Sequence, residues 1–349
     1  VEGPGTGYNP VNDNADPNVL NPAGFNWSTF DFEIDTWMLP ARQRAQAKGE
    51  SFYISLMYTS SGVSAFEHYT DPREYGEFML AVFQHMQSKY GFVPTGIEVM
   101  LEPDGKPGWN DPQTLIRCLV AAGDRLKAAG FTPEFIVPAT VNTAAAIWYI
   151  DALPNFPGAM GYATEFSYHR YADGTQANME AIASRAQQYG KRTSMLEWWQ
   201  GADAAGLYQD LVYGRNSAWQ FGIFGDSYGC GFGQTIGIIN GVATICPKAK
   251  AVRQYTKYVR PGAQRIGVAS QNPAFEPVAF INRDGGYVVV VKASAGGSFS
   301  IGGLPAGTYG LFYTTDSQYD VNLSNMTIST GQTLSTSIPD GGVITIYKK

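Results

Sequence analysis

The sequence predicts an α/β chain in two parts, a helix-covered parallel sheet in residues 1–260 and an antiparallel β-sandwich in residues 261–349. In the first part, strand-like and helix-like runs alternate with short connections, which is the pattern of parallel strands joined by helices. After "RPGAQRIG" (260–267) the helical period is lost, and short apolar runs alternate with turns rich in Gly, Asn and Asp. That second texture is typical of an antiparallel sandwich.

Six runs in the first part have the composition of strands, and helical runs separate them. One helix is expected to open at Asp71 and Pro72 and to end at Gly91, because Asp caps helices, Pro suits the first helical position and Gly ends them. A second should open at Asp111 and Pro112 and end at Gly130; two more are expected at 177–190 and after Gly201. The predicted strands are 51–60, 96–104, 133–142, 162–171, 193–201 and 217–225, and in the sandwich 286–294, 307–315 and 342–349.

Composition excludes several classes of function. A net charge of -6 without a basic patch argues against a nucleic-acid partner. No apolar run approaches the roughly 18 residues that a membrane-spanning helix needs. Much Gly and Tyr with only 15% charged residues indicates an extracellular protein, secreted or on the cell surface.

The cysteines and histidines predict no metal or cofactor site. Cys230 and Cys246 bracket one loop, which they could close as a disulfide in an oxidising compartment, whereas Cys118 lies on the apolar face of a helix as a free thiol. The three histidines do not cluster in sequence. The stretch "NPVNDNADPN" (9–18) has the composition of a calcium loop without the order of an EF-hand, so a turn-rich surface loop is the favoured interpretation.

Two glutamates stand at the ends of predicted strands, Glu102 in "MLEPD" and Glu197 in "MLEWW". In a (β/α)8 barrel, the residues that carry chemistry lie at the carboxyl ends of the strands. A pair of carboxylates is what glycoside cleavage requires, one to protonate the leaving oxygen and one to attack the sugar. Aromatic and imidazole side chains that suit sugar binding lie nearby in sequence: Trp109, His169, Tyr171, Trp198 and Trp199.

Structural explanations compete with this interpretation. Strand-end glutamates also form ion pairs, and Glu165 is a second, weaker candidate for the attacking carboxylate. Trp198 and Trp199 are adjacent, so at most one faces a sugar while the other packs. His169 is as compatible with a hydrogen-bonded structural role as with a substrate contact.

Four segments resemble glycoside hydrolase family 30, a family of clan A retaining enzymes. "EVMLEPDG" is similar to the clan's fourth-strand motif, "TSMLEWW" to its seventh-strand nucleophile motif and "SYHRY" (167–171) to its sixth-strand segment. "YTKYVRPGAQRIG" (255–267) resembles the link between that family's barrel and its sandwich. The resemblance implies a (β/α)8 TIM-type barrel before the β-sandwich, Glu102 as acid/base, Glu197 as nucleophile and a tyrosine such as Tyr171 beside it.

The chain departs from the family pattern in three respects. Leu101 stands where the clan has an Asn that binds the sugar 2-hydroxyl. No tryptophan is recognised at the end of strand eight, where Phe224 is the nearest aromatic residue. With Glu102 on strand four, 51–60 becomes strand three, and only "VEG" (1–3) remains for strand two. The first barrel strands are therefore expected from another polypeptide or a preceding segment, on the order of 40 residues or more.

The favoured hypothesis is a secreted retaining β-glycosidase acting on a polysaccharide or glycoconjugate. The alternative is a non-catalytic carbohydrate-binding or assembly-forming protein on a glycosidase scaffold, which Leu101 favours. A phosphate-handling barrel is disfavoured because no glycine-rich phosphate loop follows the late strands.

Overall fold

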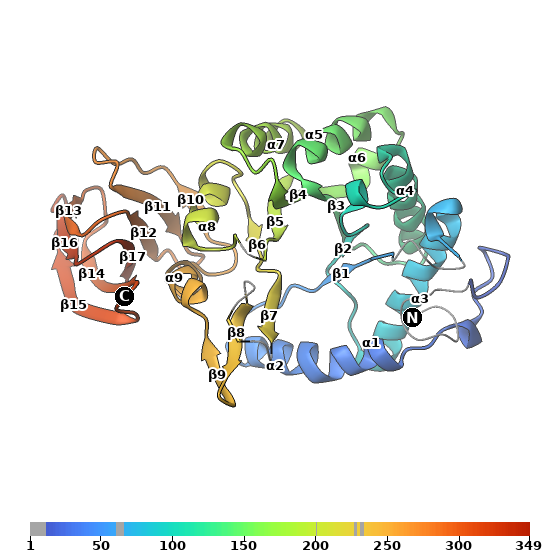
Figure 1. Ribbon diagram of the computed structural model, residues 1–349, viewed down its shortest axis with the longest axis horizontal. Coiled ribbons are helices and arrows are strands. Elements are labelled where there is room, and N and C mark those ends of the chain that lie inside the picture. The colour runs from blue at the N-terminus through green and yellow to red at the C-terminus, as the bar shows by residue number, and fades with distance from the viewer. Residues whose placement is uncertain (1–11, 61–65, 200, 227–228, 231–233) are drawn as a thin grey trace. The chain divides into compact units, whose positions relative to one another are not determined.

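The computed structural model describes residues 12–60, 66–199, 201–226, 229–230 and 234–349 (Figure 1). Its contacts divide the chain into two compact units, described separately below. The first ends at Leu196 and includes Gly214–Ala218, and the second comprises Glu197–Tyr213 and Trp219–Lys349. These two units do not coincide with the domains that the sequence predicted, 1–260 and 261–349. The domain border at residue 260 stays a prediction.

The first unit is built on a six-stranded sheet whose strands neighbour one another in chain order, β1-β2-β3-β4-β5-β6. The β1–β2, β2–β3 and β3–β4 pairs are parallel, as the alternation of strands and helices predicted. The strands are β1 (Ser55–Met57), β2 (Gly96–Glu98), β3 (Glu134–Asn142), β4 (Ala163–Ala172), β5 (Arg192–Glu197) and β6 (Ala218–Trp219).

The segment 217–225 does not form the single strand that its composition predicted. It divides into β6 and β7 (Ile223–Asp226), and β7 pairs with β8 (Gln234–Ile239) in a different sheet. Gly222 lies in the interruption, where an added Cβ would come within 1.6 Å of the indole of Trp199. A glycine with a bulky ring against its backbone weakens a strand at that point, which accounts for the break.

The helices of the first unit begin and end largely where the capping residues predicted. In α3 (Pro72–Tyr90) the Asp71 carboxylate accepts from the Arg73 N–H at 3.0 Å, and Gly91 ends the helix in the left-handed conformation. In α4 (Pro112–Ala128) the same role falls to Asp111. Further helices are α1 (Ser28–Glu33), a π-helical stretch Ile34–Met38, α2 (Leu39–Ala47), α5 (Thr143–Ala152), α6 (Ala159–Tyr162) and α7 (Gln176–Tyr189).

The second unit contains the predicted antiparallel sandwich. Its larger sheet has the order β10-β11-β12-β17-β14-β15, and β13 pairs with β16 in a second sheet. The strands are β10 (Gln264–Ile266), β11 (Phe275–Ile281), β12 (Tyr287–Ala293), β13 (Gly297–Ile301), β14 (Gly307–Thr315), β15 (Val321–Ile328), β16 (Leu334–Ile338) and β17 (Gly342–Lys348).

Both faces of β12 are covered, which explains its unbroken run of valines. Val289 and Val291 belong to the core cluster that includes Leu334 and Ile338 of β16. The alternate valines of β12 pack in a second cluster with residues of α8 (Ala204–Val212) and α9 (Pro247–Thr256). A strand buried on both faces has no reason to alternate with polar residues.

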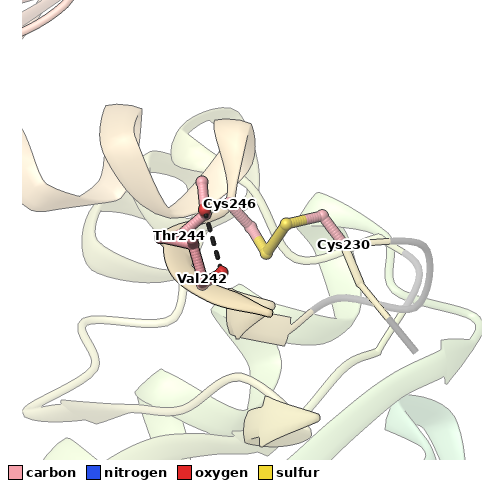
Figure 2. Close-up of a disulfide and its surroundings, with 4 residues drawn as sticks. All are labelled: Cys230, Val242, Thr244 and Cys246. Carbon is pink, nitrogen blue, oxygen red and sulfur yellow. Dashed lines mark hydrogen bonds between the residues drawn. A yellow bond between two sulfur atoms is a disulfide. The ribbon is translucent and has the colours of Figure 1, made fainter. Parts of the chain in front are cut away.

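The second unit also contains the three-stranded sheet β7-β8-β9, with β9 at Val242–Ile245. Cys230 and Cys246 form a disulfide beside this sheet, with Cα atoms 5.4 Å apart (Figure 2). Cys118, on α4, is a buried free thiol. Within the described ranges, no helix combines the length and apolar character needed to cross a membrane.

Candidate active site

Glu102 lies four residues beyond the end of β2, in a backbone conformation that is rare for its type. Its φ and ψ are 52° and 55°, in the left-handed region, where a residue with a side chain pays about 1–3 kcal/mol. Its N–H donates to the Ala139 carbonyl of β3 at 3.0 Å, and Pro103 then begins a 3₁₀ turn. Such conformations persist where the surroundings enforce them, and they concentrate at functional sites.

The loop that carries Glu102 is fastened on two sides. The Leu101 N–H donates to the Tyr58 carbonyl at 2.8 Å. The Asp104 carboxylate accepts from the N–H groups of Val141 and Asn142, at 2.9 and 3.1 Å, at the end of β3. Burial raises the pKa of Asp104, and the two backbone donors oppose that rise. Asp104 was not singled out in the sequence, although Pro-Asp-Gly is a recognisable turn signal.

His169 of β4 holds the Glu102 carboxyl from the neighbouring part of the sheet. Its Nδ1 lies 3.0 Å from Glu102 Oε1, and its ring is 1% exposed. Within the described part of the chain, His169 Nε2 is buried without a hydrogen-bond partner. This second ring nitrogen is available to hydrogen-bond a ligand, because a buried polar atom without a partner lowers the stability of the folded state.

Glu197 is the last residue of β5. Although the division by contacts falls between Leu196 and Glu197, the strand keeps the Glu197 backbone at the end of the six-stranded sheet. β5 neighbours β4, the strand that carries His169, in the sheet order. Of the residues that the sequence predicted, Glu102 and His169 are therefore in contact, and Glu197 ends the strand next to that of His169.

Glu165, the weaker candidate, has a structural environment. It lies near the start of β4, is 4% exposed and accepts from Arg192 Nε at 3.2 Å. Arg192 also binds Glu134 through both of its terminal nitrogens. This ion-pair network explains why a glutamate is buried at position 165, and no catalytic role is needed to explain it.

The aromatic residues separate into packed and exposed ones. Trp109 was expected to contact a sugar, but its ring is 0% exposed and lies among Tyr58, Tyr69 and Tyr75, so it packs in the core. Tyr171, at the end of β4, is 37% exposed, and its ring lies edge-on to His169 with centroids 6.2 Å apart. Tyr171 can therefore receive a ligand and Trp109 cannot.

The two adjacent tryptophans both lie against glycines. An added Cβ at Gly201 would lie 1.9 Å from the Trp198 ring, and one at Gly222 would lie 1.6 Å from the Trp199 ring. Trp198 is half-buried, and Trp199 keeps 36% of its surface exposed. That Trp198 contacts a sugar therefore stays a prediction, and Trp199 is the more exposed of the two. Phe224 lies in β7, and its side chain is outside the part of the chain that the structure describes.

The comparisons with known proteins agree with this architecture. The model of the glycosyl hydrolase family 30 beta sandwich domain matches residues 262–301. The GH30 xylanase C catalytic domain from Talaromyces cellulolyticus superposes with a TM-score of 0.74 at 16% identity, covering 97% of this chain and 85% of that one. A GH30 endoxylanase from Clostridium papyrosolvens C71 gives 0.72 at 18% identity, covering 96% and 88%.

A third structure extends the comparison. The endo-beta1,6-glucanase BT3312 superposes with a TM-score of 0.63 at 14% identity, covering 95% of this chain and 78% of that one. Likeness at such low identity concerns the fold, and the matching sandwich segment begins where the helical period ends in the sequence. The chain thus has a fold like that of the family 30 glycoside hydrolases, a (β/α)8-type barrel represented by six strands among the described residues, followed by a β-sandwich.

Proposed function

We propose that this protein is a secreted retaining β-glycosidase that cleaves a polysaccharide or glycoconjugate. The observation that carries the proposal is the contact of the buried His169 ring with Glu102, whose backbone is held in the left-handed conformation, in a sheet whose strand β5 ends at Glu197. Retaining enzymes place their two carboxyl groups about 5–5.5 Å apart, whereas inverting enzymes leave about 6.5–9.5 Å for a water. The resemblance of the Glu102 and Glu197 segments to those of retaining enzymes favours the shorter separation.

In the proposed reaction, Glu197 attacks the anomeric carbon while Glu102 gives its proton to the leaving oxygen. The glycosyl–Glu197 ester then forms, and Glu102 takes a proton from the water that hydrolyses it. His169 positions the Glu102 carboxyl through its Nδ1 contact. The strained backbone at Glu102 and the hydrogen bonds of Asp104 keep the loop in one conformation.

The substrate class follows from the exposed aromatic surface and the fold. Tyr171 and Trp199 each come two residues after a proposed site residue and are among the exposed large hydrophobic residues. Flat exposed rings suit pyranose faces. The comparison structures are described as two xylanases and a β-1,6-glucanase, so β-linked polysaccharides are the first substrates to test.

The second candidate is a non-catalytic carbohydrate-binding or assembly-forming protein on the same scaffold. Leu101 favours it, because the residue before the acid/base cannot hydrogen-bond the sugar 2-hydroxyl. That hydrogen bond contributes to the several kcal/mol of transition-state stabilisation gained in this chemistry. The two candidates predict opposite results with a mechanism-based probe.

The test uses a 2-fluoro glycoside series, covering xylose and glucose, followed by peptide mass mapping of the intact chain. Labelling at Glu197 supports the enzyme, and E197Q should lose both label and turnover. E102A should retain activity on substrates with good leaving groups and be partly rescued by azide. Glu180→Gln, on the exposed face of α7, is the control and should behave as wild type. No label and no hydrolysis with any probe would support the scaffold instead.

A further inference from the structure

A cleft of about 400 Å³ opens into the β-sandwich of the second unit. One wall is β13, through residues 298–302, and the other is the segment 268–272, which precedes β11. The floor comes from β11 and β12, through Phe275, Pro277, Val289 and Val291. No residue of the candidate active site lines this cleft, and its volume lies in the range of about 300–1,000 Å³ that is usual for ligand sites.

The floor of the cleft is apolar and reaches the core between the two sheets. Phe275, Val289 and Val291 belong to the buried cluster of the sandwich, and Pro277 is half-buried. Phe299, also half-buried, has its ring 5.0 Å from that of Phe275, centroid to centroid. Among the described residues, β13 and β16 form a sheet of two strands against a sheet of six, so part of the larger sheet's inner face has no strand over it.

The rim of the cleft is polar but carries no charge. Its exposed side chains end in hydroxyl or amide groups and belong to Ser270, Gln271, Asn272, Ser298 and Ser300. Ser270 Oγ donates to the Asn272 carbonyl at 2.8 Å, and Asn272 Oδ1 accepts from the Ala274 N–H at 3.0 Å. The 268–272 wall is therefore held in shape by its own hydrogen bonds, which lowers the entropy lost when a ligand binds.

A second, shallower hollow adjoins the cleft and extends its neutral surface. The two hollows share Ser298, Phe299 and Ser300, and the second is completed by residues 335–337 of β16. Ser298 lies opposite Ser337 and Ser300 opposite Ser335 in the antiparallel register, and the Ser300 and Ser335 hydroxyls are 2.8 Å apart. The small sheet thus presents four exposed serine hydroxyls beside the apolar cleft.

We propose that this cleft binds an uncharged oligosaccharide segment of a polysaccharide, as a binding site additional to the candidate active site. A pyranose ring has an apolar face of C–H groups and hydroxyls around its edge, which match the apolar floor and the hydroxyl and amide rim. An ionised ligand would lose hydration without gaining a counter-charge, because none of the residues lining either hollow is charged. The choice of a polysaccharide rests on the proposed function, whereas the preference for a neutral ligand rests on the cleft alone.

The experiment measures retardation of the full chain in native gels that contain soluble xylan or β-glucan, with E197Q as the parent so that the polymer stays intact. The parent should be retarded by at least one of the two polymers, and high NaCl should not reduce the effect. S300R should weaken binding about tenfold or more, because it sets a charge and a larger side chain against a neutral ligand. S324R is the matched control, since Ser324 is an exposed serine of β15 that lines neither hollow, and it should bind as the parent does.

Equal retardation of S300R and S324R would overturn the proposal, as would no retardation of the parent by either polymer. Stronger retardation by polygalacturonate would overturn the choice of a neutral ligand, and tighter binding of an alternating Thr-Val peptide would assign the cleft to a peptide strand. If S300R does not fold, Q271A decides the question, because it removes an exposed rim amide. Failure of the proposed function gives a different result: no label at Glu197, with retardation that is still sensitive to S300R.

Discussion

His169→Phe tests whether the contact between His169 and Glu102 serves chemistry. The substitution keeps a ring in a site that is 1% exposed and removes Nδ1, which lies 3.0 Å from Glu102 Oε1. The backbone of Glu102 stays fixed by its bond to Ala139, so the carboxyl group loses orientation without loss of the loop. We expect a catalytic defect with a modest loss of stability.

The magnitude follows from the type of hydrogen bond. A bond to a charged group is worth about 1.5–3 kcal/mol. At about 1.4 kcal/mol per factor of ten, kcat/KM should fall roughly tenfold to 150-fold. The loss should be largest for natural oligosaccharides, which need a proton on the leaving oxygen, and smaller for aryl glycosides with acidic leaving groups.

The assay compares kcat/KM for both kinds of substrate with the free energy of unfolding. His85→Phe is the matched control, because His85 Nε2 also contacts a carboxylate, Asp31 Oδ1 at 2.7 Å, and stacks on Trp27. It should lose stability while keeping wild-type kcat/KM. Equal kinetic behaviour of the two variants would refute a positioning role for His169. A uniform loss on both kinds of substrate would refute the assignment of Glu102 as the acid.

Two further predictions concern stability. Gly76→Ala should lower the free energy of unfolding by up to about 2 kcal/mol, because the added Cβ meets backbone atoms. The added Cβ would lie 2.9 Å from the Ala121 carbonyl oxygen, and such overpacking costs about 1–3 kcal/mol. The higher helix propensity of alanine returns about 1 kcal/mol of that cost. Gly161→Ala, in which no atom lies within 4 Å of the added Cβ, should leave the free energy of unfolding unchanged or raise it. If chemical denaturation finds Gly161→Ala less stable than Gly76→Ala, the packing argument is wrong. Burial acts to raise the pKa of Glu134, but hydrogen bonds from Arg192 and Tyr53 outweigh it and leave that pKa below 4.5. The carboxylate form is thus favoured by folding, so its stabilisation is present above about pH 4.5 and is lost as pH falls further. Arg192→Met should remove this part of the pH dependence and lower the free energy of unfolding by about 1–2 kcal/mol at pH 7, after allowance for solvent screening. An unchanged loss of stability below about pH 4.5, measured by denaturation at several pH values, would contradict this prediction.

The parts of the fold that were predictable from sequence depend on local chemistry. Asp71 and Pro72 open α3 and Gly91 ends it, because capping satisfies backbone groups within one turn of the chain. The change from helices to antiparallel strands was visible because it alters the period of apolar residues. The division of 217–225 was not visible, since it depends on the Trp199 ring, which lies more than twenty positions earlier.

The part of the candidate site that could be predicted from sequence is the part that lies at the ends of predicted strands. Glu102 and Glu197 follow recognisable apolar runs, and parallel strands bring their carboxyl ends to one edge of a sheet. The alternation of side chains along a strand stops at Glu197, where β5 ends, so it could not decide between Trp198 and Trp199. Glycines lie against both rings, Gly201 and Gly206 against Trp198 and Gly222 against Trp199, so these glycines alone do not decide which ring faces a ligand. What distinguishes the two rings is exposure, which depends on residues distant in sequence: Trp199 keeps 36% of its surface and Trp198 is half-buried.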